Sequence, residues 1–310
     1  MDIGLSKHLK LNQLRLIAII AEFGQLSIAA DELAITQPAA SRMLSEIEST
    51  LGAKLFTRHA KGMVPTLVGQ AICRRAHNLV VELRDLSREV EELKQGNGGS
   101  TAIGAVTGAA VGFVIPAIQQ LRAVAPKAEI DINVDTSEAL VKDLITGNND
   151  FVVARLPSHY NSSEFEILPA RTESVALLVR QGHPLAEADH VSMRDLSKYE
   201  WVMQSHRAPI REAVEGAFVA ERASLPSAIT NSTSLLALIA ILVSSNSIAP
   251  LASEVADLLM SESVGAKLTV LRLERKIELS PYFLLKLKGR NLSPLAHQLE
   301  RLIRAELSKR

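Results

Sequence analysis

The residues from Thr36 to Arg42, TQPAASR, place hydrogen-bonding side chains in the first two turns of a predicted helix. Thr36 is a favourable N-cap residue, and Pro38 falls in the first turn, where proline is tolerated. Gln37, Ser41 and Arg42 then present an amide, a hydroxyl and a guanidinium, and the residues between them are small. A helix that packs only in a core does not need this arrangement. It is typical of a helix whose first turns press against a crowded polar surface.

Two helices are expected to position this turn. The first covers Leu11 to Gly24, where the glycine can end it, and the second covers Ser27 to Ala34, with Ser27 as its cap. The third begins at Thr36 and runs to about Leu51. Helix, tight turn and helix form the helix-turn-helix geometry, in which the start of the last helix enters the major groove of DNA.

Each polar side chain of the turn has a suitable partner in that groove. Gln37 can form hydrogen bonds with an adenine edge or a phosphate, and Ser41 can do the same. Arg42 can form hydrogen bonds with a guanine or a phosphate. Thr36 and Pro38 complete the predicted DNA-binding turn. A generic three-helix bundle would give the same apolar periodicity and is the alternative to this interpretation.

A basic segment follows Gly52 and surrounds a turn at Gly62. It predicts a two-stranded wing whose cations contact phosphates, so that binding would depend strongly on salt. A solvated basic loop is the alternative. The predicted wing contacts are Lys54, Arg58, His59 and Lys61.

Composition limits the function classes. The 310 residues suggest two or more domains, and the 34 basic and 34 acidic residues balance, so nucleic-acid binding must depend on a local patch. The single cysteine, Cys73, excludes an intramolecular disulfide and fits a reducing compartment. The first residues do not resemble a signal peptide, and the apolar run Leu235–Val243 is too short to span a bilayer. We therefore expect a cytoplasmic protein with no membrane partner.

Residues 69–95 form one predicted amphipathic helix, about 40 Å long at 1.5 Å per residue. Its apolar side chains recur at helical spacing, and dimer packing is the simplest way to cover them. Cys73 lies on this helix, and because no second cysteine could resolve an oxidised thiol we expect a structural role for it. The segment 96–101, GNGGST, is a predicted flexible hinge.

From residue 102 onward, predicted strands alternate with predicted helices, which indicates an α/β fold. A second set of alternating strands and helices follows the first, and the last part of the chain returns to the first set. This pattern predicts two lobes. Lobe I would comprise about 102–170 and 268–310, and lobe II about 171–267. Ligands in such folds bind where strand ends and helix starts face the cleft.

Polar residues occupy several of the junctions between a predicted strand and the following helix, which we call corners. Thr136 and Ser137 are also suited to capping a helix, which is an equally good explanation of both. Arg155 is suited either to anchoring an anionic effector or to a salt bridge at the hinge. The complete predicted effector set is Thr107, Gly108, Thr136, Ser137 and Arg155 in lobe I, and Gln204, Ser205, Asn231, Ser232 and Thr233 in lobe II.

The segment LNQLRLIAIIAEFGQLSIAADELAITQPAASRMLSEIESTLGAKLFTRHAKGMVPTLVG resembles the winged helix-turn-helix of LysR-type transcriptional regulators. By position, Gln37, Pro38, Ser41 and Arg42 match the family's recognition turn, and Arg58 matches its wing arginine. Pro65 departs from the leucine–threonine often found there, which affects the detail of the wing.

The resemblance implies a fold and a set of partners. The fold would be a DNA-binding domain over residues 9–68, a dimerising linker helix, and an effector-binding domain over 102–310 that resembles type 2 periplasmic binding proteins. The partners would be promoter DNA, a small-molecule effector, further copies in a homodimer or homotetramer, and RNA polymerase if the protein activates. VTGAAVG and NSTSLL are similar to regulators of sugar-binding proteins within the family.

Two other function classes compete with this interpretation. A cytoplasmic solute-binding or sensor protein of the same lobe fold, without promoter specificity, leaves the first 95 residues unexplained. An enzyme is disfavoured because G-x-S-x-G, Walker and H-E-x-x-H motifs are absent from the sequence. We therefore expect no catalysis, no cofactor and no metal site. The hydroxyls and amides at the corners favour a small hydroxylated or carboxylated metabolite.

Overall fold

The computed structural model describes residues 9–60, 62–95 and 99–308, and the first three elements of this described part are helices. They are α2 (Leu11–Phe23), α3 (Leu26–Glu32) and α4 (Gln37–Leu51). Gly24 ends α2 in the left-handed conformation, as predicted. The second helix begins at Leu26, one residue before the predicted cap, and Ser27 lies inside it. The earlier start places Leu26 in the core of this domain.

Two short antiparallel strands follow, β1 (Phe56–His59) and β2 (Gly62–Pro65), with Phe56 opposite Pro65. They form the predicted wing. The N–H of Met63 donates to the carbonyl oxygen of Gly24 at 2.7 Å, which attaches the wing to the end of α2. Leu55 and Phe56, at the start of the wing, are buried.

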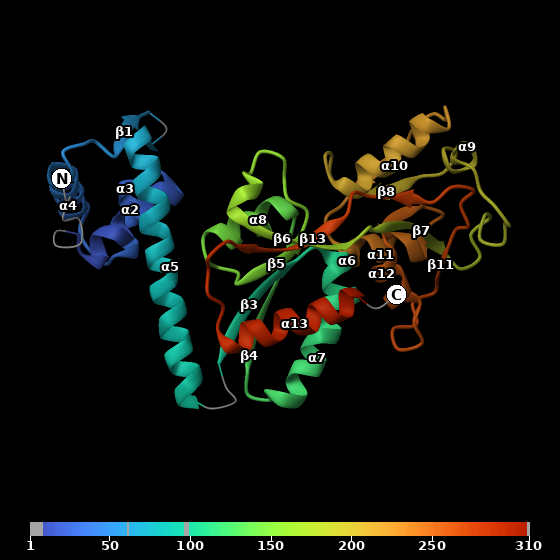
Figure 1. Cartoon of the computed structure of the whole chain (residues 1–310). Coiled ribbons are helices and arrows are strands. Elements are labelled where there is room, and N and C mark those ends of the chain that lie inside the picture. Colours follow the sequence, from blue (N-terminus) through green and yellow to red (C-terminus); the bar gives the residue numbers. More distant parts are fainter. Residues whose placement is uncertain (1–8, 61, 96–98, 309–310) are drawn as a thin grey trace.

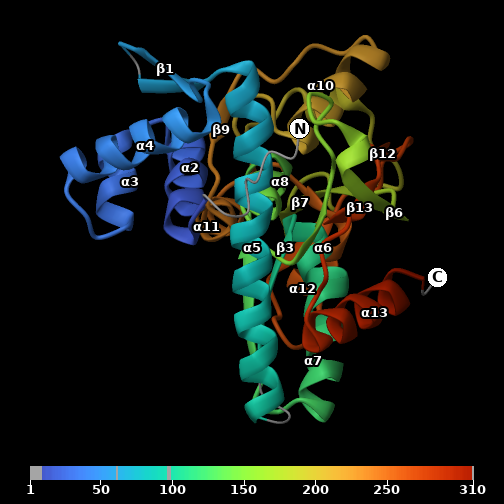
Figure 2. The same cartoon turned by 60° about the vertical axis from the view of Figure 1, so that its left-hand side comes forward.

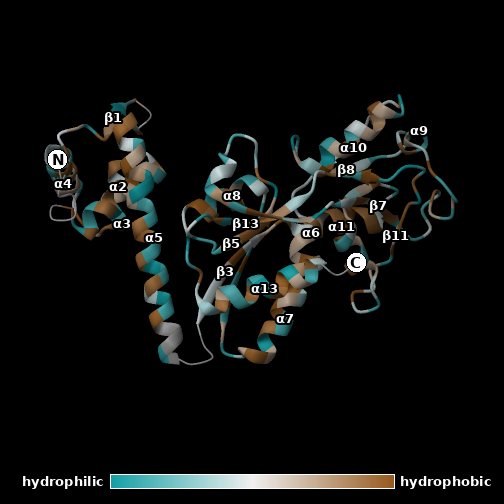
Figure 3. Cartoon of the chain, viewed as in Figure 1, coloured by the Kyte–Doolittle hydropathy of each residue, from teal (hydrophilic) through white to brown (hydrophobic). Residues whose placement is uncertain are grey.

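The long helix α5 (Leu67–Gln95) has 29 residues and stands between helices α2–α4 and the later part of the chain in Figure 1. One side of its first half packs on α2 through Cys73 and Ala76. Another side exposes Leu79, Leu83, Leu86 and Val90. Figure 3 shows hydrophobic and hydrophilic residues alternating along the length of this helix. Of the predicted hinge, residues 96–98 lie outside the described residues, and Ser100 already belongs to a strand.

Lobe I is built on a five-stranded sheet with the order β4-β3-β5-β13-β6. The first three strands in this order are parallel, and β13 is antiparallel to both of its neighbours. The strands are β3 (Ser100–Ala105), β4 (Glu129–Val134), β5 (Phe151–Ala154), β6 (Phe165–Arg171) and β13 (Tyr282–Leu287), with a 3-10 turn at Ser162–Glu164. One core contains residues of α6 (Thr107–Ala109), a π-helical turn (Ala110–Val114), α7 (Ile115–Val124) and α13 (Pro294–Ser308), and a second contains residues of α8 (Ser137–Ile145).

Lobe II contains a sheet with the order β10-β7-β11, in which β12 also pairs with β7, and a parallel pair β8-β9. Its strands are β7 (Ser174–Arg180), β8 (Trp201–Met203), β9 (Ile229–Asn231), β10 (Ala249–Ala252), β11 (Leu268–Val270) and β12 (Ile277–Glu278). Its helices are α9 (Met193–Leu196), α10 (Pro209–Ala220), α11 (Leu235–Ser244) and α12 (Ser253–Met260). Residues of α10 pack in one core, and residues of α11 and α12 in another.

The two-lobed arrangement agrees with the prediction, but one boundary differs. The sequence placed residues from 268 onward in lobe I, whereas β11 and β12 pair with β7 of lobe II. Leu268 packs in a lobe II core, which holds this segment there. The chain therefore returns to lobe I only at Tyr282. Figure 2, which turns the molecule by 60°, shows α5 crossing in front of lobe I.

Candidate functional site

The recognition turn begins α4 as predicted. The Thr36 hydroxyl accepts the N–H of Ala39 at 3.4 Å, and Pro38 stands in the first turn of the helix. Gln37 and Arg42 are exposed, and within the described residues neither side chain has a hydrogen-bond partner. Both are therefore available to an external polar ligand.

The wing joins the recognition helix through Arg58. Nη2 of this exposed arginine lies 3.5 Å from Oγ of Ser41, which is half-buried. His59 is exposed beside it, and its Nε2 lies 3.1 Å from the Thr57 hydroxyl. The structure thus brings Ser41, Arg42, Arg58 and His59 to one end of the domain, whereas Lys61 lies outside the described residues.

Lys54 differs from its neighbours because its charge is already paired. Its Nζ lies 2.6 Å from Oε2 of Glu48, a buried residue of α4. The Glu48 carboxylate also accepts the N–H groups of Leu55 and Phe56, at 2.9 and 3.4 Å. Burial alone would raise the pKa of Glu48, but these hydrogen bonds together with Lys54 lower it. The sequence showed no acid in this basic segment, and the acid comes from the preceding helix.

In lobe I, three predicted corners lie at one edge of the sheet, because β3, β4 and β5 are parallel. Thr107 is exposed at the start of α6, and the Thr136 hydroxyl caps α8 by accepting the N–H of Ala139 at 3.4 Å. The Ser137 hydroxyl accepts the N–H of Arg155 at 3.1 Å. Thr136 therefore acts as a helix cap, which is one of its two predicted roles. Ser137 instead fixes the backbone at Arg155, in the adjacent corner.

Arg155 occupies the hinge. Its guanidinium pairs with the buried carboxylate of Glu173, and its Nε donates to the carbonyl oxygen of Ser280 at 2.9 Å. These two partners belong to the two segments that cross between the lobes. Gly108 adjoins the same carboxylate, since a Cβ there would lie 2.7 Å from Oε1 of Glu173. The structure shows the hinge salt bridge, and an effector contact by Arg155 stays a prediction.

In lobe II, the buried Arg211 of α10 ties two predicted corners together. Its Nη1 donates to Oδ1 of Asn231 at 2.6 Å and to the carbonyl oxygen of Gln204 at 3.1 Å. Its Nε donates to Glu215 at 2.7 Å. Arg211 is not among the residues predicted from the sequence, because one arginine in an amphipathic helix carries no signal of its partners.

The remaining lobe II residues lie close by. The hydroxyl of Ser232 accepts the N–H of Ser234, the cap of α11, at 3.1 Å. Ser205 and Thr233 are exposed. Within the described residues, no hydrogen bond joins the predicted lobe I set to the lobe II set.

Two cavities stand out in the described part of the chain, and neither is lined by a predicted effector residue. One, of about 740 Å³, lies near the hinge and is lined by residues that include Arg171, Glu254, Arg272 and Lys276. The other, of about 470 Å³, lies between α2, α5 and residues 291–293. The predicted effector corners are thus separate from both cavities.

Comparisons with known proteins identify both parts of the chain. A model of the "LysR substrate binding domain" matches residues 94–308, and a model of the "bacterial regulatory helix-turn-helix protein, lysR family" matches residues 11–70. The chain belongs to the LysR family of transcriptional regulators. It is a DNA-binding regulator with an effector-binding domain, in agreement with the predicted fold and with the prediction that it is not an enzyme.

Named relatives of this LysR-type regulator are regulators themselves. The HTH-type transcriptional regulator GbpR of Rhizobium radiobacter is 38% identical over 249 residues, which cover 80% of this chain and 82% of the relative. The GbpR of Azospirillum brasilense is 32% identical over 291 residues, covering 94% and 84%. The solved structure of ArgP from Mycobacterium tuberculosis has the same fold, with a TM-score of 0.67, 14% identity and 96% of each chain covered.

Two further predictions concern the single cysteine and the possibility of a membrane-spanning helix in this LysR regulator. Cys73 is buried, and burial raises the pKa of its thiol to about 11, which agrees with the structural role expected for it. Among the described residues, none of the helices combines the length and apolar character needed to cross a bilayer.

Proposed function

We propose that the protein binds promoter DNA through Gln37, Ser41 and Arg42 of the recognition turn and through the wing. The observation that carries this proposal is that Gln37 and Arg42 are exposed and have no side-chain partner among the described residues, while Arg58 contacts Ser41 in the same turn. Thr36 and Pro38 fix the start of the helix, and His59 and Lys61 would contact phosphates beside the wing. Lys54 would contribute less charge there than the other wing residues, because it is paired with Glu48. A neighbour of the same fold, full-length CbnR, was solved in complex with its target DNA, at a TM-score of 0.53 and 17% identity.

We further propose that a small hydroxylated or carboxylated metabolite, a sugar or sugar acid, binds between the lobes at the corner residues. The contacts are those predicted from sequence, with hydroxyls and amides from both lobes. Binding would favour one lobe arrangement over another and so shift the population of DNA-binding states. The similarity of VTGAAVG and NSTSLL to regulators of sugar-binding proteins supports this effector class.

The assembly that we propose is a homodimer through the apolar side of α5, and a homotetramer built from two dimers. Leu79, Leu83, Leu86 and Val90 are between 40% and 53% exposed on one helix, more apolar surface than a single helix leaves open without a partner. The protein would act in the cytoplasm, where bacterial DNA lies, and would contact RNA polymerase if it activates transcription.

A ligand screen followed by a DNA titration tests the effector proposal. The full chain is heated with sugars, sugar acids, amino acids and aromatic acids, since a ligand of the folded state alone raises the melting temperature. The compound with the largest shift is then added to a titration of DNA from upstream of the gene. We expect a sugar or sugar acid to raise the melting temperature and change DNA affinity. A shift from aromatic acids alone would overturn the effector class.

A further inference from the structure

The linker helix α5 contacts lobe I of its own chain through one face. Val81, Arg84, Asp85 and Arg88 are spaced i, i+3, i+4 and i+7, so they lie on the same side of the helix. Nη1 of Arg84 lies 3.4 Å from the carbonyl oxygen of Gly147, which it contacts as a donor. Val81 is buried against the same glycine, where a Cβ would lie 2.6 Å from a Val81 methyl carbon.

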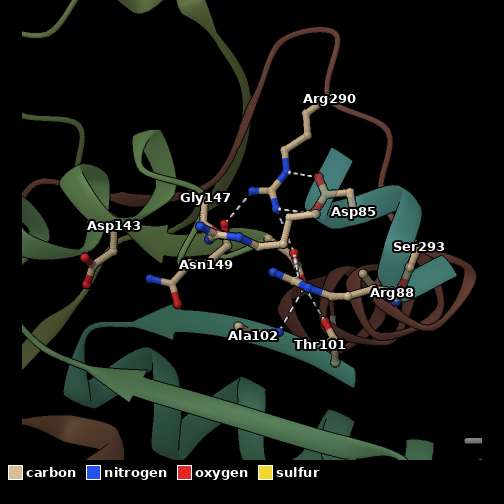
Figure 4. Close-up of polar contacts among 12 residues, drawn as sticks. Asp85, Arg88, Thr101, Ala102, Asp143, Gly147, Asn149, Arg290 and Ser293 are labelled. Carbon is tan, nitrogen blue, oxygen red and sulfur yellow. Dashed lines mark hydrogen bonds and ion pairs between the residues drawn. The ribbon is translucent and has the colours of Figure 1, made fainter. Parts of the chain in front are cut away.

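Four charged side chains hold this contact, and we call Asp85, Arg88, Asp150 and Arg290 the linker cluster (Figure 4). Nε and Nη2 of Arg290 donate to the two carboxylate oxygens of Asp85, at 2.8 and 3.1 Å. Nη2 of Arg290 also donates to Asp150 at 2.9 Å, and Arg88 donates to the same Asp150 oxygen at 2.9 Å. The side chains of Arg290 and Asp150 are only 4% and 6% exposed. Two cations and two anions from α5 and lobe I therefore neutralise one another, and the α5 members, Asp85 and Arg88, are 11% and 21% exposed.

The lobe I half of the linker cluster is itself fixed in place. The second carboxylate oxygen of Asp150 accepts the Thr101 hydroxyl at 3.0 Å and the N–H of Ala102 at 2.9 Å, both at the start of β3. Nη1 of Arg290 donates to the carbonyl oxygen of Asn149 at 2.6 Å. Buried ion pairs add little net stability compared with apolar packing, but removing one partner is strongly unfavourable. Such a cluster is therefore better suited to fixing one arrangement than to adding stability.

Strand β5 joins the linker cluster to the hinge. Asp150 directly precedes β5, Arg155 directly follows it, and all four strand residues between them are buried. Arg155 pairs with Glu173 where the chain crosses to lobe II. A short strand packed on both faces moves as one body, because a close-packed interior does not deform gradually.

We propose that the linker cluster is a latch that fixes the angle of α5 on lobe I, and that β5 couples the latch to the Arg155–Glu173 pair at the hinge. The latch uses a different side of α5 from Leu79, Leu83, Leu86 and Val90. A second copy can therefore dock on the apolar side while the latch is closed. A change at the hinge would reach the DNA-binding domain through the angle of α5.

The test measures that angle as a distance within one chain. Spin labels are attached to Ser87→Cys on α5 and Arg301→Cys on α13, two exposed positions, in a Cys73→Ala background. Labelled chains are mixed with excess unlabelled chain, so that each assembly reports one intrachain distance. The parent protein should give a single narrow distance distribution. Asp85→Asn and Arg290→Gln should each broaden it or add a second peak.

A second variant removes no charge. Gly147 has a φ of +71°, so Gly147→Ala strains the backbone and also places a methyl group against Val81; both effects should displace α5. The matched control is Glu166→Gln, which breaks the 3.0 Å pair with Lys286 on the same lobe and should leave the distance unchanged. Circular dichroism identifies any variant that does not fold. An unchanged distribution in folded Asp85→Asn and Gly147→Ala would overturn the latch.

The coupling through β5 has its own variant. Glu173→Gln removes the charge that Arg155 pairs with at the hinge and does not touch the linker cluster. If β5 couples the two, this variant should broaden the α5 distance distribution as Asp85→Asn does. A narrow distribution in folded Glu173→Gln would overturn the coupling. Neither result depends on an effector or on DNA, so the proposed function is tested separately.

Discussion

The guanidinium of Arg58, on the wing strand β1, lies 3.5 Å from the hydroxyl oxygen of Ser41, on the recognition helix α4, although 17 residues separate them. The wing and the helix therefore form one surface, which is the surface that we propose faces DNA. Arg58→Ala should weaken binding to all DNA sequences and lower the salt slope of affinity by about 1, as expected when one fewer phosphate is neutralised. Arg58→Lys should retain most of that slope. Anisotropy titrations at several salt concentrations measure it, and an unchanged slope in Arg58→Ala would remove Arg58 from the interface.

The Glu48 carboxylate should be the main polar support of the segment between α4 and the wing. Glu48→Ala leaves the buried N–H of Leu55 without its acceptor, which should lower the free energy of unfolding by about 1–3 kcal/mol. Because the pKa of Glu48 is lowered in the fold, its contribution is present above the unfolded pKa and is lost as pH falls through the folded value. Urea unfolding of wild type and Glu48→Gln between pH 7 and acidic pH should therefore converge at the acid end. Parallel curves would contradict this.

His77, on α5, should make the stability of the protein sensitive to mild acid. Its Nε2 is buried without a partner in the described part of the chain, and burial lowers its pKa. The nearby Arg84 and Arg290 lower the pKa further, whereas Glu22 and the Ile145 backbone raise it. The neutral form is the one that fits the fold, so its contribution is complete above the unfolded pKa of about 6.5 and is lost as pH falls through the lowered value. Urea unfolding at several pH values should show this loss in wild type but not in His77→Gln.

Asn231 should present hydrogen-bond donors to the effector. Its Oδ1 accepts from Arg211 at 2.6 Å, and an arginine can only donate, so the amide NH₂ points elsewhere. Asn231→Asp keeps the acceptor for Arg211 but removes those donors. With the sugar or sugar acid that gives the largest melting shift, it should weaken binding as much as Asn231→Ala. Calorimetric titration measures this, and full affinity in Asn231→Asp would exclude the donor role.

Sequence periodicity predicted the elements whose bounds are set by local sequence signals. Helices α2, α4 and α5 were placed within two residues, because caps, end glycines and apolar spacing mark them. The recognition turn and Arg58 could be chosen because this part of the fold is contiguous in sequence. Ser27 was misassigned as a cap because the burial of Leu26, a tertiary effect, moves the helix start.

The features that the sequence did not predict depend on contacts between residues that are far apart in the sequence. Arg290 and Asp85 are 205 residues apart, and no local pattern connects them. Strands β11 and β12 are three and two residues long, so their pairing with β7 could not be inferred and the lobe boundary was misplaced. Arg211 and Glu173 find their partners only when helices and hinge segments pack together.

The most direct test of the central claim is the sequence preference of the recognition turn. Anisotropy titrations compare DNA from upstream of the gene with a shuffled duplex of the same composition, for wild type and for Ser41→Ala with Arg42→Ala. The matched control is Arg301→Ala with Ser308→Ala, which removes the same side-chain types from α13. We expect the recognition-turn variant to lose the preference, by about 1–3 kcal/mol for each base that it no longer reads, while the control keeps it. A recognition-turn variant that prefers the upstream DNA as strongly as wild type would show that Ser41 and Arg42 do not read the DNA sequence.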